Sequence, residues 1–261
     1  MKALGIAATG MMAQQTNVDV ISNNIANAST TGFKSARASF QDLLYENQQR
    51  EGAPTSAQGT YLPVGIDIGL GVRTAGTNRL NTQGGLLQTE NQTDLAIEGR
   101  GYFMVNMPDG TISYTRDGNF RLNAEGQIVT QQGYEVNPGV VVPADTTQIE
   151  ISETGIVSAY IGNDPFPVEL GQINLATFIN DAGMKPLGNN LLAATVASGD
   201  ATQANPGDPA VGILRQGYLE NSNVNIIQQI TDLISAQRAY EMNSKSIETA
   251  DQMMSTANQI R

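Results

Sequence analysis

Residue types that commonly perform chemistry in proteins are scarce in this chain. Its 261 residues include no Cys, no His and no Trp. A thiolate nucleophile, an imidazole base, a disulfide framework and a zinc site of Cys and His ligands are therefore excluded. Two carboxyl groups acting together, as in glycoside hydrolases, would be the remaining chemistry, but no pair among the 25 Asp and Glu residues stands out by its spacing.

The glycine and acid motifs do not supply a binding site either. The Gly-x-Gly pairs at 69–71 and 99–101 lack the third glycine and the following helical pattern that a phosphate-binding loop requires. Asp109 and Asp117 lie in turn sequences without the spacing of a calcium-binding loop. We therefore predict no catalytic residue, no cofactor and no metal site, and a protein that is not an enzyme.

Charge and hydropathy narrow the class of partner. The formal net charge is −11, whereas binding to nucleic acid needs clustered Lys and Arg. No apolar run reaches the roughly 18–20 residues of a membrane span. Residues 1–45 have a formal charge of +1 and residues 222–261 one of −1, so the middle of the chain carries a charge equal to the whole net charge of −11. The sequence predicts neither a nucleic-acid partner nor a membrane span.

The N-terminal segment has the seven-residue periodicity of a helix. An apolar row and a second row three residues later match the a and d positions of a heptad, so we predict a helix over 1–28. The rows are Leu4, Met11, Val18 and Ile25, then Ala7, Gln14, Ile21 and Ala28. A signal peptide is the alternative, because Lys2 precedes an apolar run to Ala13. The weakly charged start and the continuation of the row to Ile25 argue against it.

The C-terminal segment repeats this design over a greater length. No Gly or Pro interrupts residues 218–261, so we predict a C-terminal helix of about 35 residues within 221–261. Asn221, Ser222 and Asn223 offer capping side chains before it. Its rows are Ile226, Leu233, Tyr240, Ile247 and Met254, then Ala236, Ala250 and Ala257.

The two predicted helices are expected to pair with each other as an antiparallel coiled coil. Ordinary core helices, the alternative interpretation, average about 11–12 residues. Apolar residues off the seam still need partners, and copies of the same chain could supply them; they are Ala8, Met12, Ala26, Ile227, Ile230, Ile234 and Met253. The predicted subunit interface consists of Leu4, Met11, Val18, Ile21, Ile25, Ile226, Ile230, Leu233, Ile234, Tyr240, Ile247 and Met254.

The middle of the chain has the pattern of an antiparallel β domain, which we place at 67–220. Glycine-containing turn sequences recur every six to eight residues between 110 and 139, with short β-prone runs between them. Residues 29–66 form a connecting segment, of which 46–66 is polar and, taken alone, typical of a linker. The predicted fold class is therefore α+β, with the β domain between two terminal helices.

Motifs at both ends and in the middle carry a family resemblance. They are NNIANASTTGFK (23–34), TDLAIEGRGYF (93–103), YTRDGNF (114–120), NSNVN (221–225) and AQRAYEMNSK (236–245). Together they resemble the axial proteins of the bacterial flagellum, the rod and hook family, over the whole chain. The residues that carry the terminal motifs are Asn24, Asn27, Gly32, Phe33, Asn223, Arg238, Tyr240 and Asn243. Within the family, the length and the 46–66 stretch are most similar to distal rod subunits.

The resemblance implies a structural role and a set of partners. It implies a helical homopolymer whose paired terminal helices form an inner tube, with the β domain outside, that transmits motor torque to the hook. The implied partners are proximal rod proteins, hook or hook-junction subunits, P and L ring proteins, and the type III export apparatus. The implied location is the basal body in the periplasm, after export without a cleaved signal peptide.

Two points stay open on the sequence. The family often has Glu near the start of the C-terminal helix, where this chain has Gln228 and Gln229, so a charge contact there does not carry over. The alternatives are another rod or hook axial subunit, or a secreted β-rich protein that binds glycans or acts on the cell wall.

Overall fold

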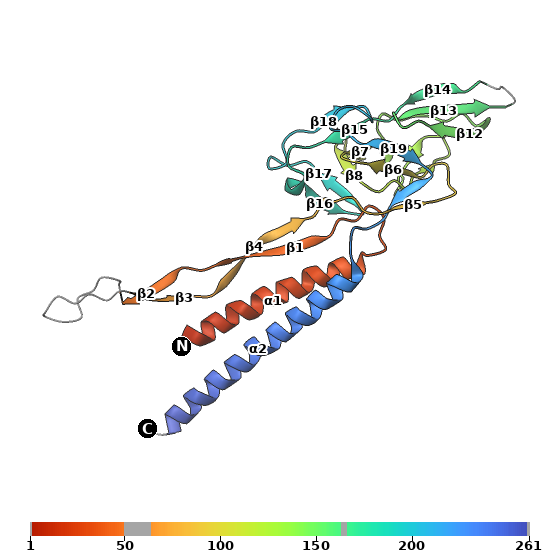
Figure 1. Ribbon diagram of the computed structural model, residues 1–261. Helices are drawn as coiled ribbons and strands as arrows, with labels where there is room; N and C mark the ends of the chain where they lie inside the picture. The colour runs from red at the N-terminus through yellow and green to blue at the C-terminus, as the bar shows by residue number, and fades with distance from the viewer. Residues whose placement is uncertain (1, 50–63, 163–165, 260–261) are drawn as a thin grey trace. The chain divides into compact units, whose positions relative to one another are not determined.

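The computed structural model describes residues 2–49, 64–162 and 166–259 (Figure 1). The chain divides into two compact units. Unit 1 combines residues 1–26, 36–78 and 225–261, and unit 2 combines residues 27–35 and 79–224. Most of the 46–66 stretch, residues 50–63, lies outside the described residues.

Two helices form the larger part of unit 1. Helix α1 is Lys2–Ala26, and α2 is Ile226–Gln259 with 34 residues, so both predicted terminal helices are confirmed. Asn24 faces Gln229, and Gly10 faces Asn243. The end of α1 therefore lies beside the start of α2, and an earlier residue of α1 lies beside a later residue of α2. The helices are side by side and antiparallel (Figure 1). Over their described residues, neither has an apolar stretch long enough to cross a membrane.

The strands of unit 1 form narrow two-stranded ribbons with mostly exposed side chains. Strand β1 (Ala36–Asp42) pairs with β4 (Val72–Arg79), and β2 (Tyr45–Gln49) pairs antiparallel with β3 (Ile66–Gly69). The ribbons contact α1, because the Val72 backbone N donates to Thr9 Oγ1 at 3.3 Å and Lys2 Nζ lies 2.6 Å from Glu46 Oε1. Pairing across the polar 46–66 stretch was not predicted, since strands exposed on both faces show no hydrophobic alternation.

Unit 2 is a β domain whose strand pairs are antiparallel. One sheet runs β16-β17-β8-β7-β11-β10-β9, with β15 joining β7 to β18, and the other groups are β12-β13-β14, β6-β19 and β5-β20. The strands are β5 (Leu86–Gln88), β6 (Leu95–Glu98), β7 (Tyr102–Asn106), β8 (Ile112–Thr115), β9 (Arg121–Leu122), β10 (Ile128–Val129), β11 (Glu135–Val136), β12 (Thr146–Ile151), β13 (Ile156–Ile161), β14 (Val168–Gln172), β15 (Leu175–Thr177), β16 (Lys185–Gly188), β17 (Leu191–Ala193), β18 (Thr202–Ala204), β19 (Ile213–Gln216) and β20 (Tyr218–Glu220), with a 3-10 turn η1 (Asp181–Gly183).

The turn residues that predicted this domain have the backbone geometry that glycine favours. Gly110, Gly126, Gly133 and Gly139 all have φ between +80° and +85°, where a side chain would be strained. The strands between them close over a core in which the rings of Phe103 and Phe120 meet edge to face at 5.0 Å. The central antiparallel β region of the predicted α+β fold is therefore confirmed.

Candidate assembly interface

The contact between α1 and α2 is built from small and polar side chains. Ala13 and Ala236 are buried, each 3% exposed. A Cβ atom placed on Gly10 would lie 3.0 Å from Asn243 Nδ2, so the absence of a side chain there lets the helices approach closely. Ile21 of α1 is also buried, whereas the isoleucines at the start of α2 remain exposed.

Asn24 fixes the C-terminal end of α1 to two other segments of unit 1. Its Nδ2 donates to Ala36 O at 2.7 Å and to Gln229 Oε1 at 2.9 Å, and its Oδ1 accepts from the Ala36 backbone N at 2.9 Å. The residue is 2% exposed, so these bonds replace those that water would make. The Gln229 side chain thus accepts a hydrogen bond from a neutral donor.

The start of α2 is capped by a residue just downstream of the predicted ones. The Gln228 backbone N donates to Asn225 Oδ1 at 3.2 Å, which is the N-cap geometry for a helix beginning at Ile226. Asn223 instead binds inside unit 2, where its Oδ1 accepts from Ser35 N and its Nδ2 donates to Leu80 O. The prediction of Asn221, Ser222 or Asn223 as the cap was therefore wrong, because these side chains lie before the helical backbone begins.

The predicted interface residues divide into three groups by exposure. Ile21 is buried; the half-buried ones are Leu4, Met11, Val18, Ile25, Leu233, Ile247 and Met254; the exposed ones are Ile226, Ile230, Ile234 and Tyr240. The described part of the chain leaves the four exposed side chains uncovered, so another molecule can contact them.

Four isoleucines at the start of α2 form an exposed apolar surface, here called the isoleucine face: Ile226, Ile227, Ile230 and Ile234. Their spacing places them along one side of the helix. Ile227 is 80% exposed, Ile230 is 46% and Ile234 is 44%. Contiguous exposed apolar groups mark interaction surfaces more often than scattered ones do, so this face is the strongest candidate for a contact between molecules.

The remaining family-motif residues lie in both units. Gly32 has φ +66° and packs so closely on the Arg116 backbone that a Cβ would meet its carbonyl carbon at 2.8 Å. Asn27 accepts a hydrogen bond from Thr30 Oγ1 at 3.2 Å, and Phe33 is half-buried. Arg238 and Tyr240 are exposed on α2. Asn24 and Asn243 are thus the motif residues that lie in the helix seam.

A buried ionic cluster in unit 2 was not predicted. Glu220 Oε1 accepts from Lys34 Nζ and Glu220 Oε2 accepts from Arg116 Nε, each at 2.6 Å. The Gly84 backbone N adds a third bond to Glu220 at 2.9 Å, and Arg116 also donates to Gly99 O at 2.6 Å. The cluster joins the segment that follows α1 to the strand that precedes α2. Lys34 and Arg116 lie within the resemblance motifs, but nothing in their spacing connects them to Glu220.

Burial and charge pairing shift the pKa values of Glu220 and Lys34 in opposite directions. Burial alone would raise the pKa of Glu220, but the charge of Arg116 and the hydrogen bond from Lys34 outweigh it, and the pKa lies below its ordinary value. Burial lowers the pKa of Lys34, and its hydrogen bond to Glu220 acts in the opposite direction. Each of the three groups is paired with an opposite charge and is also hydrogen-bonded to backbone atoms, so the cluster links separate segments of the chain.

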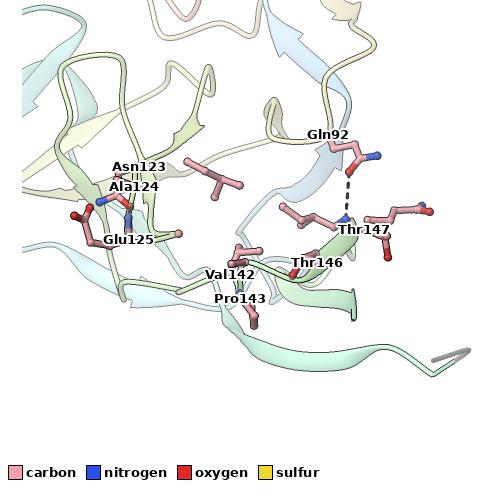
Figure 2. A pocket seen from close by; sticks show the side chains of 13 residues that line it. Gln92, Asn123, Ala124, Glu125, Val142, Pro143, Thr146 and Thr147 are labelled. Atoms are coloured by element: carbon pink, nitrogen blue, oxygen red, sulfur yellow. Dashed lines mark hydrogen bonds between the residues drawn. The ribbon is translucent and has the colours of Figure 1, made fainter. Parts of the chain in front are cut away.

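A shallow hollow of about 340 Å³ in unit 2 is the place where a small ligand would be sought (Figure 2). Gln92 borders it, and Gln92 Oε1 accepts a hydrogen bond from the Ile149 backbone N at 3.2 Å. Glu125 is the one ionisable side chain among the described residues that line it. Hydrolysis of a glycoside by the usual mechanism needs two carboxyl groups, whereas the described lining of this hollow contains a single carboxyl group, that of Glu125. No group of three or more acids that could hold a metal occurs among the described residues.

Comparison with known proteins decides the family. Successive parts of the chain match three family models: flagella basal body rod protein (residues 4–34), flagellar hook protein FlgE/F/G D1 domain (residues 96–159) and flagellar basal body rod FlgEFG protein C-terminal (residues 215–260). The flagellar basal-body rod protein FlgG of Agrobacterium fabrum is 52% identical over 98% of this chain and 97% of its own. The chain belongs to the flagellar basal-body rod protein family.

More distant members of the rod protein family match over the same extent. The FlgG protein of Caulobacter vibrioides is 50% identical over the full length of both chains, and that of Bacillus subtilis is 38% identical over 97% of each. The predicted resemblance is thereby confirmed, and the role of the protein is structural. The two terminal family matches contain most of α1 and α2, the helices whose surfaces form the candidate interface.

Proposed function

We propose that this protein is a subunit of the distal rod, which assembles with its own copies into a straight tube that transmits motor torque to the hook. The isoleucine face carries the proposal. Burying apolar surface stabilises an interface by about 25 cal/mol per Å², and the described part of this chain leaves these side chains uncovered. Similarity to rod proteins over the full chain supports the same conclusion.

The helix pair is the element that we expect to form the inner tube. Its narrow seam of Gly10, Ala13 and Ala236 supports an antiparallel coiled-coil pairing. In an assembled tube, Ile226, Ile230, Ile234 and Tyr240 would be covered by neighbouring subunits, and Leu4, Met11, Val18, Ile25, Leu233, Ile247 and Met254 would border both the seam and those contacts. A shaft held by many such contacts in parallel resists twisting, even though each one is weak.

The proposed partners and location follow from the rod family. They are proximal rod proteins, hook or hook-junction subunits, the P and L rings, and the flagellar type III export apparatus, with the assembled rod in the periplasm. Ala13 and Asn24 are buried in unit 1, which supports retention of the N-terminal segment in the assembled protein. Intact mass measurement on isolated basal bodies tests this, since a cleaved leader would shorten the chain by α1.

Electron microscopy of the purified protein tests the proposed assembly. We expect straight, hollow tubes of uniform diameter that form above a threshold protein concentration. A protein that stays monomeric at every concentration, also in the presence of short rod fragments as seeds, would contradict the proposal.

A further inference from the structure

A second surface of unit 1 lies toward the other end of the helix pair. It is an open hollow of about 450 Å³ between the first half of α1, the second half of α2 and β4. Most of the residues that line it are small, namely Ala3, Ala7, Gly10, Gly71 and Ser246. We call it the small-residue hollow.

The hollow and the isoleucine face differ in side-chain size, and both expose apolar surface. The hollow is lined by small side chains around an open space. The isoleucine face consists of bulky, branched side chains that are exposed. Ala7 and Ser246 line the same hollow, and Ser246 is 16 positions beyond Ile230, about 24 Å along α2. One molecule therefore cannot insert its own isoleucine face into its own hollow.

We infer that the isoleucine face of one subunit inserts into the small-residue hollow of the next, as a head-to-tail contact along the rod. The occupant of the hollow is thus a second copy of this chain. Two different surfaces that join head to tail generate an open helical filament when the rotation between successive copies does not close a ring. The inference rests on the proposed function and adds the pair of surfaces that meet in the growing tube.

Disulfide trapping tests this contact directly, because the natural chain has no Cys. We would combine Ala7→Cys with Ile230→Cys, form tubes under reducing conditions, and then oxidise. The two positions are too far apart within one chain for a disulfide, whose Cα atoms lie about 4.4–6.8 Å apart. We expect a ladder of covalent oligomers on denaturing gels from tubes, and monomer from dilute protein.

The matched control is Gly5→Cys combined with Ile230→Cys. Gly5 lies between Ala3 and Ile6 on α1 but does not line the hollow. It is exposed, and a Cβ there would meet no atom within 4 Å. This pair is expected to give tubes without the ladder. Tubes without a ladder from the Ala7 and Ile230 pair would overturn the inference and leave the proposed assembly intact. Absence of tubes from the natural chain would overturn both.

A size-exchange series gives a second, independent measurement. Ala7→Leu fills the hollow and is expected to raise the protein concentration needed for tube growth about tenfold or more. Adding Ile230→Ala should restore growth, because the smaller side chain fits the reduced space. Gly5→Leu is the control for adding the same side chain outside the hollow. Equal growth of the Ala7→Leu and Gly5→Leu variants would contradict the inferred contact, whatever the result of the trapping experiment.

Discussion

The Asn24 side chain donates a hydrogen bond to Gln229 Oε1 at 2.9 Å across 205 residues of sequence. The same amide exchanges two hydrogen bonds with the backbone of Ala36. One buried side chain thus holds the end of α1, the start of α2 and the first residue of β1 together. Only an amide can both accept from Ala36 N and donate to two oxygens, which explains why the position needs Asn.

Substitutions of Asn24 and Gln229 should show which of the two side chains must donate a hydrogen bond and which must accept one. Asn24→Asp is expected to lower the free energy of unfolding by about 1–3 kcal/mol, because a carboxylate would face the Ala36 and Gln229 oxygens without a proton to donate. Gln229→Glu keeps an acceptor for Asn24 and should cost much less than Gln229→Lys. Denaturant unfolding measures the difference, with exposed Ser22→Ala as the control. Equal losses from Gln229→Glu and Gln229→Lys would contradict this account.

The buried cluster around Glu220 predicts a large effect from a single neutralised charge. In Glu220→Gln, Lys34 and Arg116 would remain buried without their counter-charge, and breaking a buried pair costs about 3–5 kcal/mol. Glu98 bonds Arg215 at 2.8 Å, but its side chain is 46% exposed. Glu98→Gln should therefore cost less than about 1 kcal/mol. Chemical unfolding of unit 2 compares the two variants, and similar small losses would show that the cluster is dispensable.

The same carboxyl group predicts acid lability. The pKa of Glu220 is lower in the folded chain than its ordinary value of 4.5. Below pH 4.5 the unfolded chain therefore binds a proton that the folded chain does not, and stability falls with falling pH until the folded group also protonates. Above pH 4.5, the stabilisation that the ionised Glu220 carboxylate gives to the folded chain is present in full. Glu220→Gln should flatten the acid limb of a stability-against-pH curve; an unchanged slope would argue against this group as its source.

Local sequence signals predicted the elements of the fold well. The uninterrupted heptad rows of 226–254 define α2, and the turn glycines from Gly110 to Gly139 define the hairpins around β8 to β11. Both signals depend on neighbours in sequence. The Gly, Pro, Asn and Ala content of residues 181–213 indicated long loops with at most one strand, whereas the chain forms β16, β17 and β18 there. Although β16 and β17 pair with each other, β17 also pairs with the remote β8 through Leu191 and Thr115. The sequence of the segment carries no sign of that remote pairing.

The candidate interface was predictable in part, for a similar reason. Helical periodicity identified Ile230 and Ile234 as apolar residues in need of partners. It did not show that Ala3, Ala7 and Gly71 border one hollow, because Gly71 comes from a ribbon that is brought to α1 by the Thr9–Val72 hydrogen bond. The Glu220 cluster was missed because single charges far apart in sequence have no period that could connect them.

Removing residues 46–66 tests the role of the ribbon in the proposed rod. The deletion takes away Glu46, the partner of Lys2, and the pairing of β2 with β3, but it retains both helices. We expect tubes that still form but are more flexible and curved, measured as a shorter persistence length in electron micrographs. Glu46→Gln is the control that removes only the ion pair. Straight tubes of normal stiffness after the deletion would mean that the segment acts only as a linker.

A charge placed on the isoleucine face should block assembly without unfolding the subunit. Ile230 is exposed, so Ile230→Asp is expected to change the stability of the monomer by no more than about 0.5 kcal/mol. Tube growth should nevertheless stop, because the carboxylate would lose its hydration in a subunit contact.

Two further variants separate this effect from folding. Leu233 is half-buried beside the seam, so Leu233→Asp should both destabilise the helix pair and block tubes. Ser235 is exposed next to Ile234 but lies on another side of α2, so Ser235→Asp should do neither. Circular dichroism of the monomer and electron microscopy of the tubes distinguish the three outcomes. Normal tubes from Ile230→Asp would show that the isoleucine face stays in solvent in the assembled rod.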